Sequence, residues 1–413
     1  MTAALEAALA QFEGLYPDSI ELSLGRIQDV LDTLGRPQDK LPPTIHVAGT
    51  NGKGSTCAYL RAMAEQAGLS VHVYTSPHLV RFNERIRLAG ELVTDDALIT
   101  WLDRVYAALE GREITRFEAT TATALLAFSE VQADLLILEV GLGGRFDATN
   151  VVTEPALSVI TPVDFDHKQF LGSDLAFIAG EKAGIIKAER PVVSAIQARV
   201  CGDVIRAQAE ALSAPLTVLR MEDIEKVPER VALPGTHQRY NAALAGLAMR
   251  TLGHSEIGGH AIWAGAQSAI WPARMQRLSD GPVTRLGNGA EVWLDGGHNP
   301  HAATAIAELL REMGGRTVMV TAMLDSKDHG GFFHPFKGVA EAVHTLPNAP
   351  GHASADPKQL ADTARAFLPD AHAHSSLEAA MAGAANGKPD RILIGGSLYL
   401  AGEVLQKNGE LPT

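Results

Sequence analysis

A short apolar run that breaks into a glycine-rich turn constrains the fold of this chain more than any other feature. Residues 44–48 (T-I-H-V-A) have the composition of a buried strand, and the turn Gly49-Thr50-Asn51-Gly52-Lys53-Gly54-Ser55 follows at once. A helical pattern then runs from Ser55 to Gln66, with Gly68 as its expected end. Glycines let successive backbone N–H groups converge on phosphate oxygens, and the following helix adds partial positive charge. The segment therefore predicts a phosphate-binding strand–turn–helix unit.

The turn departs from the commonest phosphate-binding pattern at two positions. Ala48 stands where a first glycine is expected, and Gly54 separates Lys53 from Ser55. Lys53 is nevertheless placed to neutralise the outer phosphates of a nucleotide. The alternative is a tight strand-to-helix turn with a solvated lysine.

The rest of the chain alternates short apolar runs with helical patterns, as in a parallel sheet covered by helices. Residues 134–140 are apolar on both faces, as expected of an interior strand. Further strands are expected at 71–74, 157–161, 191–195, 291–295, 317–323 and 391–394, and helices at 175–186, 237–252, 302–313 and 398–405. With 413 residues the chain is long for one domain. We expect two α/β domains, residues 1–271 and a smaller 272–413.

Composition excludes several classes of protein. The 35 Lys and Arg against 48 Asp and Glu give a net charge of −13, which disfavours nucleic acid and anionic membranes as partners. Two cysteines cannot build a disulfide framework, and no apolar run reaches the roughly 18 residues of a membrane span. The N-terminal residues also lack the basic start of a signal peptide. We expect a soluble, cytoplasmic enzyme.

Polar residues follow several predicted strands, where an open α/β sheet binds its ligands. Glu139 ends one strand, Asp166 and His167 follow another, and Ser76 follows a third. Glu139 with His167 or Asp166 could hold Mg²⁺ for a bound nucleotide. The alternatives are an ordinary strand-end acid, a structural histidine and a serine that caps a turn.

Three further sets of polar or charged residues could have a functional role. Asp295 and His298 follow a strand of the second domain and could bind polar parts of a nucleotide or amino acid, whereas helix capping is the alternative. Arg274, near the expected linker, could reach a phosphate or be solvated. The basic group at 81–87 could face an anionic substrate or form a solvated strand face.

Taken together, the motifs resemble the dihydrofolate synthase/folylpolyglutamate synthase family, a branch of the Mur ligase superfamily. The matching runs are V-A-G-T-N-G-K-G-S (47–55), T-S-P-H-L-V-R-F-N-E-R-I-R (75–87), L-E-V-G-L-G-G-R-F-D-A-T-N (138–150), D-H (166–167), E-K-A-G-I-I-K (181–187), D-G-G-H-N-P-H (295–301) and M-L-D-S-K-D (323–328). They follow the family's order over most of the chain. The resemblance implies a P-loop-type Mur ligase central domain and a Rossmann-like C-terminal domain.

The resemblance also implies roles for individual residues. Those implied to bind ATP are Thr50, Asn51, Gly52, Lys53, Gly54, Ser55, Asn241, Arg274, Asp295 and His298. Those implied to hold one or two Mg²⁺ ions are Ser55, Ser76, Glu139 and His167. The implied catalytic residues are Lys53, Glu139, His167 and Lys182. Lys182 matches the lysine that is carbamylated in this family, and the alternative is an exposed helix lysine. The pteroate contacts are expected from Leu22, Ser23, Leu24, Thr115, Arg116, Phe117 and Glu118, and the glutamate contacts from Asp295, His298 and Ser397.

The implied activity is ATP-dependent amide formation between L-glutamate and dihydropteroate or tetrahydrofolate, through an acyl phosphate, by a monomer. Three alternatives stay open: a folylpolyglutamate synthase alone, a cell-wall Mur ligase acting on UDP-sugar peptides, and a kinase or NTPase with the same loop. A non-enzymatic nucleotide-binding module would not need Glu139, His167 and Lys182 around one site.

Two regions depart from the family pattern. After T-R-F-E (115–118) comes Ala119-Thr120-Thr121, where a relative has Tyr-Gly-Thr, so the pocket for pteroate is expected to differ. The family's G-R-F-Q is Ala273-Arg274-Met275-Gln276 here, and the span from Arg274 to Asp295 is longer. Gly287-Asn288-Gly289 predicts a hairpin turn inside that span.

Overall fold

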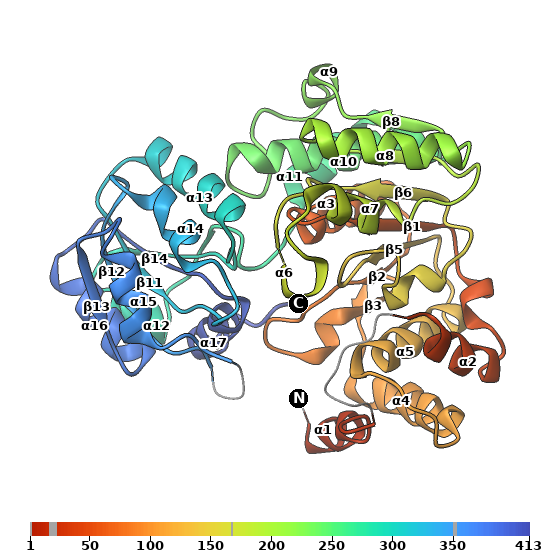
Figure 1. Ribbon diagram of the computed structural model, residues 1–413, viewed down its shortest axis with the longest axis horizontal. Coiled ribbons are helices and arrows are strands. Elements are labelled where there is room, and N and C mark those ends of the chain that lie inside the picture. The colour runs from red at the N-terminus through yellow and green to blue at the C-terminus, as the bar shows by residue number, and fades with distance from the viewer. Residues whose placement is uncertain (1, 16–22, 167, 350–352) are drawn as a thin grey trace. The chain divides into compact units, whose positions relative to one another are not determined.

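The chain divides into two compact units. The computed structural model describes residues 2–15, 23–166, 168–349 and 353–413. Described residues up to Ala232, together with Arg239–Ile270, form the first unit. Leu233–Gln238 and Trp271–Thr413 form the second. Both are α/β, and Figure 1 shows their elements.

The first unit is built on a mixed sheet that, in the described residues, has eight strands in the order β4-β3-β2-β5-β1-β6-β7-β8. Its strands are β1 (Thr44–Ala48), β2 (Val71–Tyr74), β3 (Ile86–Leu88), β4 (Glu91–Leu92), β5 (Leu135–Glu139), β6 (Leu157–Ile160), β7 (Val192–Ser194) and β8 (Leu216–Val218). All neighbours pair in parallel except β2 with β3 and β3 with β4. Every residue of β1 and β5 is buried, which explains why both strands are apolar on both faces.

Helices cover this sheet and supply its cores. They are α1 (Ala3–Ala10), α2 (Gly25–Thr33), α3 (Lys53–Gln66), α4 (Asp95–Leu109), α5 (Arg116–Glu130), α6 (Lys168–Leu171), α7 (Leu175–Ala183), α8 (Arg199–Ala211), α9 (Met221–Ile224), α10 (Thr236–Leu252) and α11 (Gly259–Ser268), with short 3-10 turns at Pro37–Lys40, Phe82–Arg85 and Ala148–Val151. Figure 1 shows α4 and α5 side by side with α1 against α4, and their buried side chains share one core. A second core joins β6 and β7 to α7 and α8.

The second unit repeats the architecture on a smaller scale. Its described sheet has the order β13-β12-β11-β14-β10-β9, with only β9 antiparallel to its neighbour. The elements are β9 (Gln276–Arg277), α12 (Pro282–Leu286), β10 (Glu291–Leu294), α13 (Pro300–Met313), β11 (Thr317–Thr321), α14 (His329–Phe333), the 3-10 turn His334–Phe336, β12 (Ala340–Thr345), α15 (Pro357–Ala364), β13 (Asp370–Ala373), α16 (Leu377–Asn386), β14 (Arg391–Gly395) and α17 (Leu398–Asn408).

Several predicted boundaries are wrong, each for a local reason. The helix expected from Ser55 begins at Lys53, because Gly52 takes the left-handed conformation (φ +83°) immediately before it. The helix expected from 302 begins at Pro300, because the side chain of Asn299 caps it. The simple hairpin expected around 287–289 is also wrong: β9 and β10 are antiparallel neighbours, but α12 lies between them.

No helix in the described parts of the chain combines the length and apolar character needed to cross a bilayer.

Candidate active site

The candidate active site of the first unit lies along one edge of its sheet. The strands β2, β5, β1 and β6 are consecutive neighbours and all run parallel. Their carboxyl ends therefore meet at the same edge, where open α/β sheets bind ligands. Ser76 follows β2, Glu139 ends β5, the glycine-rich turn follows β1 and residues 161–166 follow β6. The sheet order thus gathers segments that are far apart in the sequence.

The glycine-rich turn is held against the loop that follows β6. The backbone N–H groups of Thr50 and Asn51 both donate to the carbonyl oxygen of Pro162, at 3.0 and 3.2 Å. The hydroxyl of Thr50 donates to the carbonyl of Asp164 at 2.9 Å. These two N–H groups are thus committed within the protein. The N–H groups of the first turn of α3 remain the natural donors to a phosphate, since they have no partner inside the helix.

Lys53 curls back over the turn that precedes it. Its Nζ donates to the carbonyl oxygens of Gly49 and Thr50, at 3.1 and 3.4 Å. The same residue opens α3, while Ser55 is buried in the first turn of that helix. Asn241 of α10 lies beside the turn, because a Cβ added to Gly52 would stand 2.6 Å from its Oδ1. The structure therefore brings Lys53, Ser55 and Asn241 to one place.

Glu139 and Ser76 meet across the β2–β5 pair. The backbone N–H of Ser76 donates to Oε2 of Glu139 at 3.1 Å, and Glu139 is only 4% exposed. His167, the third expected metal ligand, lies outside the described residues. The carboxylate is therefore fixed at the sheet edge beside the phosphate-binding turn.

A buried carboxylate organises the loop that follows Glu139. Asp147 accepts hydrogen bonds from the N–H of Leu142 at 2.8 Å, and from the N–H and hydroxyl of Thr149 at 3.0 and 2.6 Å. Burial raises the pKa of Asp147, and these hydrogen bonds oppose the shift. Asp147 was not predicted as a site residue, although it lies in the G-G-R-F-D-A-T-N run. An acid inside a glycine-rich turn after a buried strand was the available signal.

Lys182 projects from α7 into the same region. It is 4% exposed, and burial together with the positive charge of Lys53 lowers its pKa from 10.5 to about 7. The negative charges of Asp166, Asp147 and Glu181 act in the opposite direction. The backbone of α7 is fastened to the Asp147 loop, because the N–H of Arg145 donates to the carbonyl of Glu181 at 2.8 Å. The buried Lys182 and the half-buried Lys53, from two different helices, thus lie near enough for their charges to interact.

In the second unit, Asp295 is the centre of a buried polar turn. Its carboxylate accepts the N–H of Met275 at 2.8 Å and the N–H of Gly297 at 2.7 Å. Burial raises the pKa of Asp295, whereas the guanidinium of Arg274 and the two N–H donors lower it. His298 donates from Nδ1 to the carbonyl of Gly296 at 3.1 Å, since a carbonyl can only accept.

Ser397 lies beside this turn but serves as a helix cap. Its hydroxyl accepts the N–H groups of Tyr399 and Leu400 at 3.1 and 3.4 Å, and caps α17. The N–H of Gly396 donates to the carbonyl of Gly297 at 3.2 Å, which joins the two turns. Arg274, Asp295, His298 and Ser397 are therefore gathered within this unit.

The segments expected to contact pteroate are largely committed to local structure. The carboxylate of Glu118 accepts the N–H of Thr115 at 2.8 Å in a capping box, and pairs with Arg26 of α2 at 3.1 Å. Phe117 lies 6.4 Å from the ring of Tyr74, at the edge of the core. Arg116 is half exposed and pairs with Glu13, 3.3 Å away.

At the N-terminal end, the hydroxyl of Ser23 accepts the N–H of Gly25 at 3.3 Å, and Leu24 packs at the edge of the core. Leu22 lies outside the described residues. Ser23 and Leu24 thus lie at the start of α2, where both residues already make contacts within the protein.

Two known domain models and several known proteins match this chain. Residues 47–211 match the Mur ligase middle domain, and residues 273–398 match the Mur ligase glutamate ligase domain. The chain is 36% identical to the dihydrofolate synthase/folylpolyglutamate synthase of Bacillus subtilis, over 83% of this chain and 85% of that protein. It is 34% identical to the Escherichia coli protein of the same name, over 97% and 95%.

The chain belongs to the dihydrofolate synthase/folylpolyglutamate synthase family.

Solved structures of family members superimpose on the whole chain. Escherichia coli FolC in complex with DHPP and ADP has a TM-score of 0.86 at 31% identity, and 98% of each chain is covered. The Yersinia pestis enzyme complexed with AMPPNP and a Mn ion has a TM-score of 0.82 at 30% identity, with the same coverage. These proteins are similar to this family member in sequence and in fold.

The residues at the sheet edge fit a hard divalent cation bound with a nucleotide. Glu139 offers a buried carboxylate and Ser55 and Ser76 offer hydroxyl groups, and oxygen is the ligand that Mg²⁺ prefers. Within the described ranges, no three His, Cys, Asp or Glu side chains gather as a metal site on their own. Phosphate oxygens and water would have to complete the shell, as is usual for Mg²⁺.

Replacement of Gly52 by alanine is expected to damage the phosphate-binding turn. A Cβ there faces both the left-handed φ of +83° and the Oδ1 of Asn241 at 2.6 Å. We expect the free energy of unfolding to fall by about 1–3 kcal/mol, and ATP binding in calorimetric titration to weaken at least about tenfold. Gly68→Ala is the matched control, because Gly68 has φ +80° and open space around it. Equal ATP affinity in the two variants would contradict the assignment.

Proposed function

We propose that this chain is an ATP-dependent ligase that joins L-glutamate in amide linkage to dihydropteroate and to tetrahydrofolate and its polyglutamates. One observation carries the proposal. Lys53, Glu139 and Lys182 lie near one another at the carboxyl edge of β2, β5, β1 and β6, with Glu139 and Lys182 buried and Lys53 half-buried. Family members of the same fold are named for this pair of activities.

The reaction needs an activated carboxylate, because a carboxylate ion resists attack by an amine. Transfer of the γ-phosphoryl group of ATP to the substrate carboxylate gives an acyl phosphate. The amino group of glutamate then attacks the acyl carbon, loses a proton and expels phosphate. Lys53 and the first-turn N–H groups of α3 stabilise the negative charge on the transferring phosphoryl oxygens.

Magnesium would be held by Ser55, Ser76, Glu139 and His167 together with phosphate oxygens. When bound, such an ion neutralises phosphate charge and orients the γ-phosphoryl group. The protein fixes the carboxylate of Glu139 in advance through the N–H of Ser76. Related structures hold Mn with AMPPNP, and one also holds L-glutamate.

Lys182 is proposed to carry a carbamate. Carbamylation requires an unprotonated amine, and a pKa of about 7 leaves about half of the Lys182 side chains neutral at neutral pH. The neutral amine reacts with carbon dioxide to form an N–C bond and releases one proton, which turns the neutral amine into a carbamate anion; starting from the ammonium form, two protons are lost. That anion would sit beside the ammonium of Lys53, whose charge now disfavours protonated Lys182.

Residues 1–271 are proposed to bind ATP and the pteroate part of the substrate, and residues 272–413 to bind glutamate through Asp295, His298 and Ser397. In this assignment Arg274 and Asn241 contact the nucleotide. We further propose that the protein acts as a monomer in the cytoplasm, which size-exclusion chromatography with light scattering tests for the oligomeric state.

The activity is tested by ADP release with Mg-ATP and L-glutamate, with dihydropteroate and tetrahydrofolate offered separately. We expect release with each substrate, and only when glutamate is present. Release with tetrahydrofolate alone would leave a folylpolyglutamate synthase, the name borne by the relative from Lacticaseibacillus casei. Glutamate-independent release would indicate a kinase or NTPase. Turnover with a UDP-sugar peptide, and with neither pteroate substrate, would overturn the folate assignment.

A further inference from the structure

The turn that carries Arg274 has an unusual backbone. Ala273 and Met275, on either side of Arg274, both have positive φ angles, of 54° and 42°. Residues with a Cβ rarely adopt this conformation, and each costs on the order of 1 kcal/mol. The side chains of Ala273 and Met275 are completely or almost completely buried. A turn of this kind persists only when its surroundings hold it in place.

The turn that follows β10 holds one side of the Arg274 turn through hydrogen bonds. The N–H of Met275 donates to Asp295 at 2.8 Å, and the N–H of Gly296 donates to the carbonyl of Ala273 at 2.9 Å. That carbonyl also accepts the guanidinium of Arg274 at 2.9 Å. The nucleotide-binding candidates Arg274 and Asp295 are thus linked through the strained backbone itself.

The other side of the turn is held by Gln276. Its Oε1 accepts the N–H of Ala273 at 3.0 Å, so the amide closes the turn from within. Its Nε2 donates to Oε2 of Glu410, 3.0 Å away and 134 residues later in the chain. The side-chain amide of Gln276 therefore connects the C-terminal segment to the Arg274 turn by hydrogen bonds.

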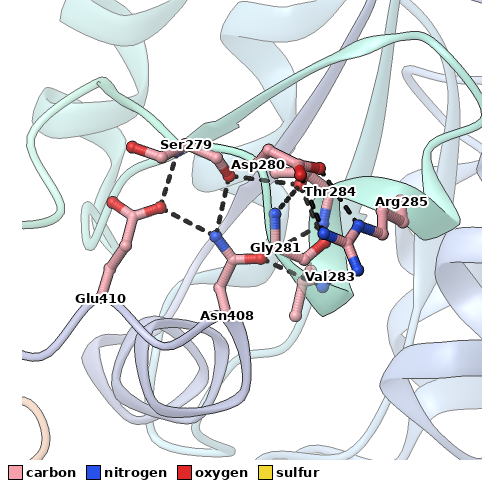
Figure 2. A network of polar contacts seen from close by, with 8 residues as sticks. All are labelled: Ser279, Asp280, Gly281, Val283, Thr284, Arg285, Asn408 and Glu410. Carbon is pink, nitrogen blue, oxygen red and sulfur yellow. Dashed lines mark hydrogen bonds and ion pairs between the residues drawn. The ribbon is translucent and has the colours of Figure 1, made fainter.

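Glu410 is itself fixed by a polar network, which Figure 2 shows. Its Oε1 accepts the N–H of Ser279 at 2.7 Å and Nδ2 of Asn408 at 2.8 Å. Asn408 also donates to the carbonyl of Ser279 at 3.1 Å, while its Oδ1 accepts the N–H groups of Val283 and Thr284 at 3.0 and 3.3 Å. The end of α17 is thereby fastened to the start of α12.

Gly281 is what allows this close approach. A Cβ at that position would lie 2.6 Å from the backbone carbonyl oxygen of Asn408. The longer span between Arg274 and Asp295 thus contains both a docking point for the C-terminal segment and the residue that links this point to the arginine.

We propose that Glu410 is a positioning residue that acts through Gln276 to hold Arg274 in the orientation in which it binds the nucleotide. The inference rests on the proposed function, in which Arg274 contacts ATP. The proposal means that a C-terminal segment, which contains none of the family's motifs, helps to orient a nucleotide-binding residue. Glutamate suits the position because its two carboxylate oxygens accept three N–H donors.

Glu410→Gln in the full chain is the first test, since it keeps the size of the side chain and replaces one acceptor by a donor. We expect calorimetric titration to show an ATP dissociation constant about tenfold higher than that of the unaltered protein. Gln276→Met should have a similar effect, and the double variant should be no worse than either single one, because both residues act in one path.

The matched control is Asp280→Asn. This substitution breaks the ion pair of Asp280 with Arg285. The pair lies in the same region, as Figure 2 shows, but both of its side chains are exposed. The control should leave ATP affinity unchanged. If Glu410→Gln matched it, the inference would be overturned.

A second comparison separates positioning from general loss of structure. In an Arg274→Ala background, Glu410→Gln should change the ATP dissociation constant by less than about twofold. An equal loss with and without Arg274 would overturn the inference, as a purely structural role predicts. These experiments measure ATP binding, whereas the proposed function is tested by ADP release with pteroate substrates. If the unaltered protein released no ADP with those substrates, the proposed function would fail, and that result is distinct from a failure of the positioning role.

Discussion

Lys53→Met is expected to lower kcat for ADP release by about a thousandfold, which is typical of losing one charged group from a phosphoryl-transfer site. Lys53 opens α3 and lies over the glycine-rich turn, with its Nζ 3.1 Å from the carbonyl of Gly49. In the proposed mechanism, its ammonium stabilises the negative charge that grows on the γ-phosphoryl oxygens during transfer. The loss should therefore fall more on kcat than on the Michaelis constant for ATP.

Lys40→Met is the control for Lys53→Met. Lys40 is exposed in the 3-10 turn Pro37–Lys40, so its removal deletes a similar charge without touching the site. Circular dichroism and thermal unfolding should show that both variants fold. A Lys53→Met protein with nearly normal kcat would remove Lys53 from the catalytic machinery and return the turn to a structural role.

The strands that line the site were the most predictable part of the fold. The runs at 44–48 and 71–74 are strands with the predicted bounds, and that at 134–140 contains β5 at 135–139. These strands are buried on both faces, so their apolar composition has no competing explanation. The edge strand β13 was not predicted, because Asp370-Ala-His-Ala has no continuous apolar run and three of its four residues are exposed.

The candidate site residues were predicted from short motifs and, for Lys182, from the resemblance to the family alone. The phosphate-binding turn, Glu139 and Lys182 stand in short runs typical of the family. Glu118 shows the opposite case, because the sequence could not reveal that α2 would bring Arg26 to its carboxylate. Gln276 and Glu410 show it again, since their hydrogen bond joins segments 134 residues apart. Pairings of this kind depend on the tertiary fold, which local patterns do not encode.

Lys182→Met is expected to stabilise the ligand-free protein while it abolishes ligation. Burial lowers the pKa of Lys182 from 10.5 to about 7, so between these values the unfolded chain binds a proton that the folded chain does not. The stability of the unaltered protein should therefore rise with pH from about 7 to 10.5, and the full penalty should be present below about 7. Because each pKa unit corresponds to about 1.4 kcal/mol, we expect Lys182→Met to raise the free energy of unfolding by about 2–4 kcal/mol at pH 6.5.

Urea unfolding from pH 6.5 to 10, in buffers depleted of carbon dioxide, measures this difference. The difference between the two stability curves should shrink steadily toward pH 10 and vanish only above about 10.5, where Lys182 is neutral in both the folded and unfolded states. Bicarbonate then separates a merely buried lysine from a carbamylated one. At pH 8 it should stabilise the unaltered protein and add 44 Da by native mass spectrometry, because a carbamate adds one carbon dioxide, and it should do neither to Lys182→Met. Parallel stability curves would mean that Lys182 keeps an ordinary pKa in the folded protein. An unchanged mass in bicarbonate would mean that Lys182 is a buried neutral amine and that its role requires no carbamate.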